Sequence, residues 1–171
     1  MKVIIINGSA QNGKDNFVKY FKKNYEYKCM NWSAIDKVKK IAKRNFGWNG
    51  KKTNEARKFL SEIKRVWIEF NNGPFEDIIK KISKHLLTLS EIDSKNIVYF
   101  IHCREPYEIQ KFADKYGDDC VTLLLKREDR IVPDNDSDKN VDNYNYNFII
   151  KNNGNKKDLE QESIKFIENI K

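Results

Sequence analysis

The feature that most constrains this chain is a glycine-bearing loop that directly follows a short apolar run. Residues 2–7 read KVIIIN, and the next eight residues, GSAQNGKD, hold two glycines separated by four residues and followed by a lysine and an aspartate. A continuous β-branched run is typical of a parallel strand that is covered on both faces. Phe17 and Phe21 then fall on one face of a helical pattern. A strand, a tight loop and a helix are therefore predicted in direct succession.

In this setting, Gly-x4-Gly-Lys is the sequence of a phosphate-binding loop. Gly8 has no Cβ, so the chain can leave the strand in a tight turn. Gly13 lets the backbone approach a phosphate. The start of the helix adds its amides and dipole, and Lys14 bridges the outer phosphates as a point charge. Such loops usually continue with Ser or Thr to hold Mg²⁺. Here Asp15 follows the lysine, and its carboxylate is a hard oxygen ligand for that ion, directly or through water.

Strand and helix patterns alternate along the rest of the chain, which predicts a parallel sheet with helices on both faces. The class is therefore α/β, a three-layer P-loop NTPase fold with about five strands. After the first strand, strands are expected at residues 27–31, 96–103, 120–126 and 146–151. Helices are expected from residue 14, from the capping pair Ser33 and Asp36, over 53–71, from Pro74, from Pro106 and over 156–170. The helix over 53–71 carries an apolar stripe that includes Val66 and Phe70.

Length and composition restrict the class of protein further. At 171 residues the chain is expected to form a single domain over residues 1–171. No run of 18 apolar residues exists, so we expect no membrane span and a cytoplasmic location. The three cysteines form an odd number without metal-binding spacing, which indicates reduced thiols.

The net charge of +8 has two interpretations. The lysines are spread along several helices rather than gathered in one block, which favours solvated faces together with a polyanionic small ligand. The alternative is a surface that binds nucleic acid.

Several stretches resemble one known family. GSAQNGKD resembles the Gly-x4-Gly-Lys-Asp loop of the phage-type deoxynucleoside monophosphate kinases, in which the aspartate is usual. ARKFLSEI resembles that family's Arg-x-x-Leu-Gln segment, with Arg57 in place. HCREPYE is similar to its Asp-Val-Arg-x-x-x-Glu segment, with Arg104 and Glu108 matching and His102 where aspartate is usual. LLLKRED resembles the strand that leads into an arginine-bearing lid, and NFIIKNNG is similar to the closing Asn-x-Gly turn near the nucleotide base.

The resemblance implies an enzyme, a nucleotide kinase of deoxynucleotide metabolism that uses ATP and Mg²⁺ to convert a (deoxy)nucleoside monophosphate to the diphosphate. It implies a helical acceptor-binding region at about 33–91 and a lid-like segment at about 127–145, a polar stretch too long for an idle connection. The implied ATP-binding residues are Gly8, Ser9, Ala10, Gln11, Asn12, Gly13, Lys14, Asp15, Asn16, Asn152 and Gly154, with Asp15 as metal ligand. The acceptor-binding residues are Asp36, Arg57 and Arg104, and the catalytic residues are Lys14, Arg104, Arg127 and Arg130.

The residues themselves leave some alternatives open. Asp36 is explained equally well as an acid in the first turn of a helix, and His102 as a hydrogen-bonded structural histidine or a participant at the site. The expected partners are ATP and a small phosphorylated acceptor, and a homodimer is compatible with the sequence. One rival function is a P-loop kinase that acts on another small metabolite. Another is a nucleotide-binding protein whose basic surface binds nucleic acid.

Overall fold

The structure is a computed structural model that describes residues 1–128 and 140–170. The chain divides into two compact units, of which the first comprises Met1–Trp32 with Ser90–Lys171 and the second Ser33–Leu89. Each unit is described by itself below. The part of the chain that is described contains no helix long and apolar enough to cross a membrane.

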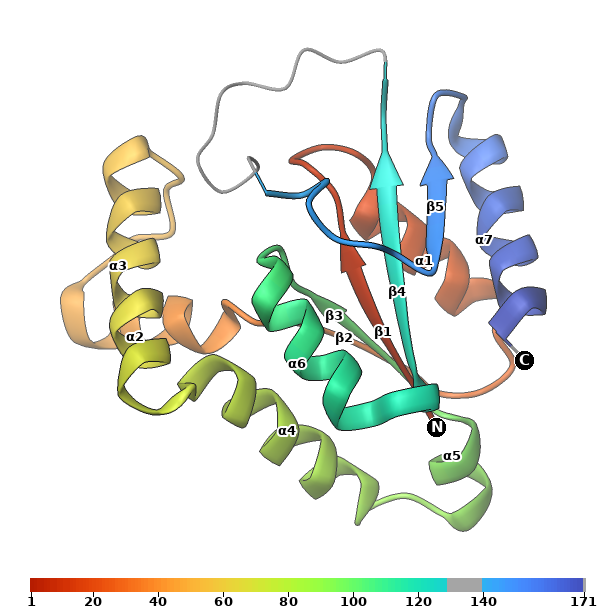
Figure 1. The fold of residues 1–171 in the computed structure, drawn as a ribbon, viewed down its shortest axis with the longest axis horizontal. Helices are drawn as coiled ribbons and strands as arrows, with labels where there is room; N and C mark the ends of the chain where they lie inside the picture. The colour runs from red at the N-terminus through yellow and green to blue at the C-terminus, as the bar shows by residue number, and fades with distance from the viewer. Residues whose placement is uncertain (129–139, 171) are drawn as a thin grey trace. The chain divides into compact units, whose positions relative to one another are not determined.

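The first unit is built on a five-stranded sheet with the order β2-β3-β1-β4-β5 (Figure 1). Its strands are β1 (Lys2–Asn7), β2 (Cys29–Ser33), β3 (Val98–His102), β4 (Cys120–Lys126) and β5 (Phe148–Lys151). Strand β1 pairs in parallel with β3 and β4, and β4 pairs in parallel with β5. The strand that leads into the glycine loop therefore lies at the centre of the sheet.

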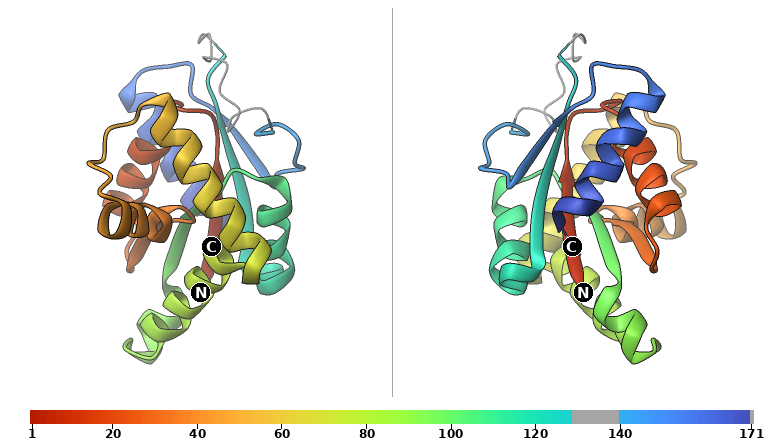
Figure 2. Two further views of the ribbon diagram at one scale, coloured as in Figure 1. Left: turned by 90° about the vertical axis from the view of Figure 1, so that its left-hand side faces the viewer. Right: turned by 90° about the vertical axis from the view of Figure 1, so that its right-hand side faces the viewer.

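Helices cover both faces of this sheet (Figures 1 and 2). Helices α1 (Lys14–Asn24) and α7 (Lys156–Ile170) pack together on one face, and α6 (Pro106–Tyr116) covers the other. The α1–α7 layer is rich in aromatic contacts: the rings of Phe21 and Phe100 lie 4.8 Å apart and those of Phe17 and Phe166 5.6 Å apart, centroid to centroid. The predicted α/β class, with a parallel five-stranded sheet between two helical layers, is confirmed.

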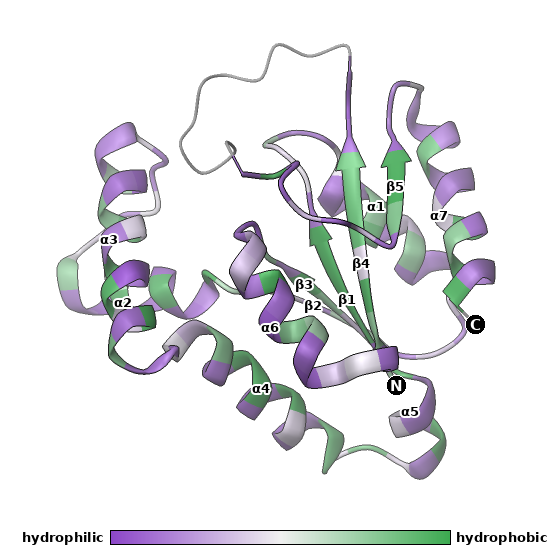
Figure 3. Cartoon of the chain, viewed as in Figure 1, coloured by the Kyte–Doolittle hydropathy of each residue, from purple (hydrophilic) through white to green (hydrophobic). Residues whose placement is uncertain are grey.

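The strands are apolar on both faces because both are covered, which is the arrangement that a continuous β-branched run predicts. All four residues from Val3 to Ile6 are fully buried, and the hydropathy colouring shows the same apolar character along β4 and β5 (Figure 3). Ile4 and Ile6 face the α1–α7 layer.

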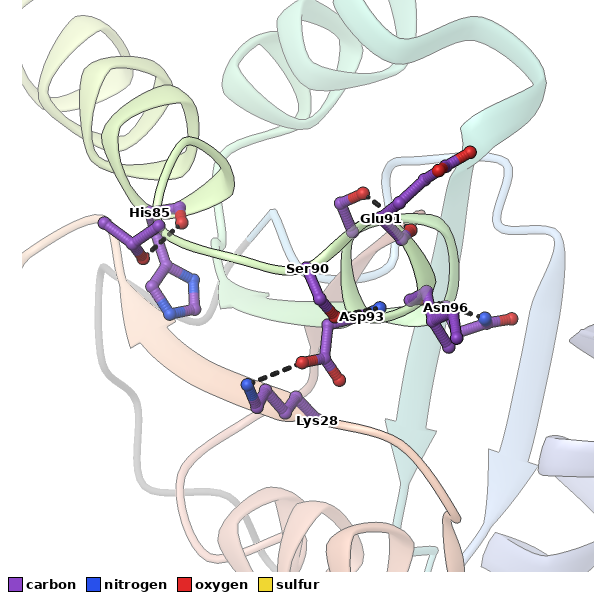
Figure 4. A network of polar contacts seen from close by, with 9 residues as sticks. Lys28, His85, Ser90, Glu91, Asp93 and Asn96 are labelled. Atoms are coloured by element: carbon purple, nitrogen blue, oxygen red, sulfur yellow. Dashed lines mark hydrogen bonds and ion pairs between the residues drawn. The ribbon is translucent and has the colours of Figure 1, made fainter.

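A short helix precedes β3. The sequence pattern predicts no helix here and a strand that begins at Asn96. This helix, α5 (Glu91–Asn96), begins after Ser90, whose Oγ accepts a hydrogen bond from the Asp93 backbone N–H at 3.2 Å. Asp93 also forms an ion pair with Lys28 at 2.7 Å (Figure 4). The Lys28 ammonium and the Ser90 hydroxyl hold the pKa of the Asp93 carboxyl below its usual value. The cap and the ion pair explain why Asn96 ends a helix rather than beginning a strand.

The second unit is helical and comprises α2 (Asp36–Phe46), α3 (Asn54–Asn71) and α4 (Gly73–Leu86). Its core is small, with Val38 and Ala42 of α2 and Leu60 of α3 buried. The apolar stripe expected on α3 is wrong at its end, because Val66 is 55% exposed and Phe70 82% exposed. Phe59, Ile63 and Trp67 pack against the core of this unit, whereas Val66 and Phe70 of the same stripe are exposed.

Element boundaries differ from the sequence prediction at three strands and one helix. Strand β2 begins two residues later than expected, and β3 and β5 are shorter. The β5 prediction fails at Asn147 because its hydrogen bonds to β4 involve side chains instead of a backbone ladder: its Oδ1 accepts from the Thr122 N–H at 2.8 Å, and its N–H donates to Thr122 Oγ1 at 2.9 Å. Helix α2 begins at Asp36 rather than after Ser33, although the Asp36 carboxylate accepts from the Ser33 N–H at 2.8 Å, as one half of a capping box does.

Candidate functional site

The loop after β1 adopts a conformation that requires both of its glycines. Gly8 has φ of 138° and Gly13 has φ of 95°, values that residues with a Cβ rarely adopt. Space is restricted as well: a Cβ on Gly8 would collide with the backbone carbonyl of Leu125, and one on Gly13 would lie 2.5 Å from Asn152 Nδ2. Glycine is therefore required at both positions for two reasons: the positive φ angle and the close approach of neighbouring atoms.

Lys14 reaches back across this loop. Its Nζ donates to the carbonyl oxygens of Gly8 and, at 2.8 Å, Ser9. Helix α1 begins at Lys14, and no side chain of the described residues caps the helix start at Gly13. Uncapped amides at a helix start, with an ammonium held beside them, form an arrangement that suits an anion.

Two buried asparagines fix the loop to the sheet. Asn12 Nδ2 donates to Leu125 O at 3.1 Å, and Asn152 Nδ2 donates to Asn12 O at 3.0 Å. The Asn152 backbone N–H donates to Lys126 O at 2.7 Å. The structure thus places Asn152, expected near a nucleotide base, against the loop backbone. Gly154 follows two residues later, close to the Asp158 side chain.

A third asparagine, which was not among the predicted site residues, connects the loop to two other segments. Asn7 is fully buried at the end of β1, and its Oδ1 accepts from the Gly8 N–H at 2.7 Å. Its Nδ2 donates to Arg104 O at 3.1 Å and to the Tyr146 hydroxyl at 2.6 Å. That hydroxyl donates in turn to Val141 O at 2.8 Å, and burial raises the pKa of Tyr146 to about 12. The sequence signal was a polar residue that ends an otherwise apolar strand.

Asp15, the predicted metal ligand, points outward from the first turn of α1, with its side chain 97% exposed. His102 lies beside it, with Nε2 4.0 Å from Asp15 Oδ1 and 2.9 Å from Asn31 Oδ1. His102 is therefore hydrogen-bonded and also borders the loop. The residues fit Mg²⁺, which is usually bound by one or two carboxylates together with phosphate oxygens rather than by a full protein cage. The described residues contain no group of three or more potential metal ligands.

Two of the predicted arginines follow strands that flank β1. Arg104 lies two residues after β3, where Asn7 binds its carbonyl, and Arg127 directly follows β4. Because β3, β1 and β4 are parallel, all three carboxyl ends meet at one edge of the sheet, where open α/β sheets bind ligands. The loop and both arginine positions therefore share that edge.

Three predicted residues remain. Asp36 is the first residue of α2, and Arg57 is exposed on the first turn of α3, so both belong to the second unit. Arg130 lies outside the described residues.

The described end of the lid-like segment, residues 140–145, is attached to the first unit. Val141 is 4% exposed, and Asp142 forms an ion pair with Lys126 at 2.8 Å. The Tyr144 hydroxyl donates to Gln110 Oε1 of α6 at 3.2 Å. These contacts fix where the segment rejoins the sheet.

Comparison with known proteins supports the fold. No protein-family model matches this sequence, and no curated protein matches it. The structure is similar to TT1252 from Thermus thermophilus, with a TM-score of 0.55 and 13% identity over 99% of this chain and 98% of that one. It is also similar to dephospho-CoA kinase from Campylobacter jejuni, with a TM-score of 0.52 and 17% identity over 99% and 97% of the two chains. A sugar kinase from Janibacter gives a TM-score of 0.50 and 9% identity over 98% and 95%. The chain thus has the α/β fold of P-loop kinases.

The Asn7 contacts generate a stability prediction. Tyr146→Phe leaves a buried Asn7 N–H and the Val141 carbonyl without their partner, so we expect it to lower the free energy of unfolding by about 1–3 kcal/mol. The control is Tyr144→Phe, which removes an exposed hydroxyl. Urea denaturation of both variants measures the difference. Equal losses in the two variants would show that the Asn7 connection contributes nothing to stability.

Proposed function

We propose that this protein is an ATP- and Mg²⁺-dependent kinase that transfers a phosphoryl group to a (deoxy)nucleoside monophosphate. The observation that carries this proposal is the loop of residues 8–16: two glycines that tolerate no Cβ, an uncapped helix start and an inward-reaching Lys14. The similarity to kinase structures supports it through the fold.

The triphosphate of ATP occupies this loop in the proposal. Residues 8–16 supply backbone amides, and Lys14 exchanges the carbonyl oxygens of Gly8 and Ser9 for phosphate oxygens. Asn152 and Gly154, which follow β5, border the nucleotide. Since Asn152 also fixes the loop through Asn12 O, nucleotide binding and loop geometry depend on one side chain.

Asp15 holds the metal in this proposal, because its carboxylate is exposed at the start of α1. The ion held by Asp15 would supply positive charge against the negative charge that develops on the phosphate oxygens. Asp15 lies on the first turn of α1, and His102, which is hydrogen-bonded to Asn31, borders it.

The acceptor phosphate is bound by Arg104, because a guanidinium matches phosphate geometry and this residue follows a central strand. Arg127 contributes positive charge from the end of β4, and Arg130 does so from the proposed lid over residues 127–145. The proposal also assigns acceptor binding to Asp36 and Arg57, and it treats residues 1–171 as a single kinase domain. Phosphoryl transfer requires mainly positioning and charge stabilisation, which these residues supply.

The nucleotide identity of the acceptor rests on the resemblance to the phage-type deoxynucleoside monophosphate kinases. A second candidate is a kinase of another small metabolite. The structural neighbours favour it, since one is a dephospho-CoA kinase and another a sugar kinase. Both candidates use the same loop and differ in the acceptor alone.

Lys14→Ala tests the nucleotide site. Removing a charge-assisted hydrogen bond of about 1.5–3 kcal/mol should weaken ATP binding by roughly 10- to 100-fold. Lys19→Ala, on an exposed position of the same helix, is the matched control and should bind as the wild type does. Titration calorimetry with ATP measures both, and circular dichroism checks the fold. Unchanged affinity in folded Lys14→Ala would refute the proposed loop function.

Arg104→Ala tests the acceptor site. We expect KM for the monophosphate to rise at least about tenfold with little change in ATP affinity, since only the acceptor phosphate loses a charged contact. Arg65→Ala, which removes an exposed arginine of α3, is the control. The measurement is coupled ADP release at varied monophosphate and fixed ATP. A variant that loses ATP affinity and keeps its monophosphate KM would contradict the assignment.

A further inference from the structure

The second unit contains a cavity of about 320 Å³ between α2 and α4. Its apolar lining is limited to Ala34 and Ile78, and its acidic lining to Asp36 and Asp77. Its remaining charged lining consists of five lysines, Lys37, Lys40, Lys80, Lys81 and Lys84. A cavity of this size matches a small-molecule ligand, and its lining is strongly basic.

With five lysines and two carboxylates, the lining carries three more positive than negative groups. Asp77 faces Lys37 at 3.9 Å, and Asp36 is engaged by the Ser33 N–H at 2.8 Å. Lys37 and Lys40 on α2, and Lys80 and Lys84 on α4, lie three and four residues apart, where like charges destabilise the folded state, and Asp36 and Asp77 offset this repulsion only in part. A basic surface assembled at such a cost is explained by an anion that binds there.

Lys81 shows the effect of this environment. Partial burial lowers the pKa of the Lys81 ammonium, and the neighbouring Lys40 lowers it further, against the opposing attraction of Asp36 and Asp77. An anion beside Lys81 and Lys40 would raise the pKa of Lys81 again, because it favours the charged ammonium. Anion binding and this side chain are therefore coupled.

The basic lining continues along α2. A second hollow of about 530 Å³ shares Lys37 and Lys40 with the cavity and adds Lys43 and Arg44. Positions 37, 40 and 44 span about two turns of α2, or roughly 10 Å at 1.5 Å per residue. The length of this row suits a few linked phosphate groups.

We propose that the α2–α4 lysine cavity is a binding site for a compact anion with two or more phosphate groups, such as a di- or triphosphate chain. None of the lining residues belongs to the loop of residues 8–16, so the cavity is separate from the proposed ATP site, although it includes Asp36, which the proposed function assigns to the acceptor. The lining residues of both hollows include no aromatic side chain on which a base could stack, which favours a phosphate chain over single-stranded nucleic acid.

The experiment is titration calorimetry with inorganic tripolyphosphate in a metal-free potassium buffer. The protein carries Lys14→Ala in every sample, which weakens phosphate binding at the loop. In that background we expect binding to persist, and Lys40→Gln/Lys81→Gln to weaken it at least about tenfold. The matched control is Lys52→Gln/Lys58→Gln, which removes the same charge from exposed positions of the same unit. Equal affinity in the two double variants overturns the proposal.

A second measurement needs no variant of the cavity. Lysine acetylation followed by mass spectrometry, with and without tripolyphosphate, should show protection of Lys81 and Lys40 and none of Lys58. Absence of that protection at saturating tripolyphosphate overturns the proposal. A 12-nucleotide single strand that binds more tightly than tripolyphosphate, and is lost in Lys40→Gln/Lys81→Gln, overturns it in favour of a nucleic-acid interface.

The two proposals fail independently. If Lys14→Ala does not change ATP binding, the proposed loop function is refuted and the proposed cavity site is not. Binding of tripolyphosphate that is insensitive to Lys40→Gln/Lys81→Gln refutes the cavity and leaves the loop untouched.

Discussion

The close approach of Gly8 to the Leu125 carbonyl is the constraint on which the site depends. It occurs where β1 ends beside β4, so the loop leaves the sheet directly against the neighbouring strand. Asn12 donates to the same carbonyl, and Asn152 holds the other side of the loop. With the backbone fixed on both sides, Lys14 and the start of α1 are oriented before any ligand binds. Such preorganisation is what a phosphate-binding loop requires, since its contacts are backbone amides.

The central elements of the fold could be predicted because their signals are local. The bounds of β1, β4 and α7 match the apolar patterns closely. The predictions of burial and of element bounds failed where tertiary packing or a local cap determines the structure. Phe70 fits the helical stripe of α3, but no core covers it, and it stays 82% exposed. The helix α5 is only six residues long and depends on its Ser90 cap, too short for periodicity to reveal.

The candidate site also contains residues that the sequence reveals and contacts that it does not. Residues 8–16 were recognisable because their spacing alone specifies a glycine loop before a helix. The Asn7–Tyr146 hydrogen bond joins residues 139 positions apart, and no sequence pattern indicates such a pair. The lysines of α2 and α4 looked evenly distributed along the sequence, yet five of them line one cavity. Charge spread along a chain therefore says little about charge density on a folded surface.

The central claim is that this loop binds ATP so that its phosphoryl group passes to a monophosphate. The most direct test is ADP release from ATP and Mg²⁺ across a panel of ribo- and deoxyribonucleoside monophosphates, with dephospho-CoA and simple sugars in the same panel. We expect ADP release that depends on at least one nucleoside monophosphate and that Arg104→Ala diminishes. ADP release that no nucleoside monophosphate stimulates, with tight ATP binding intact, would contradict the claim.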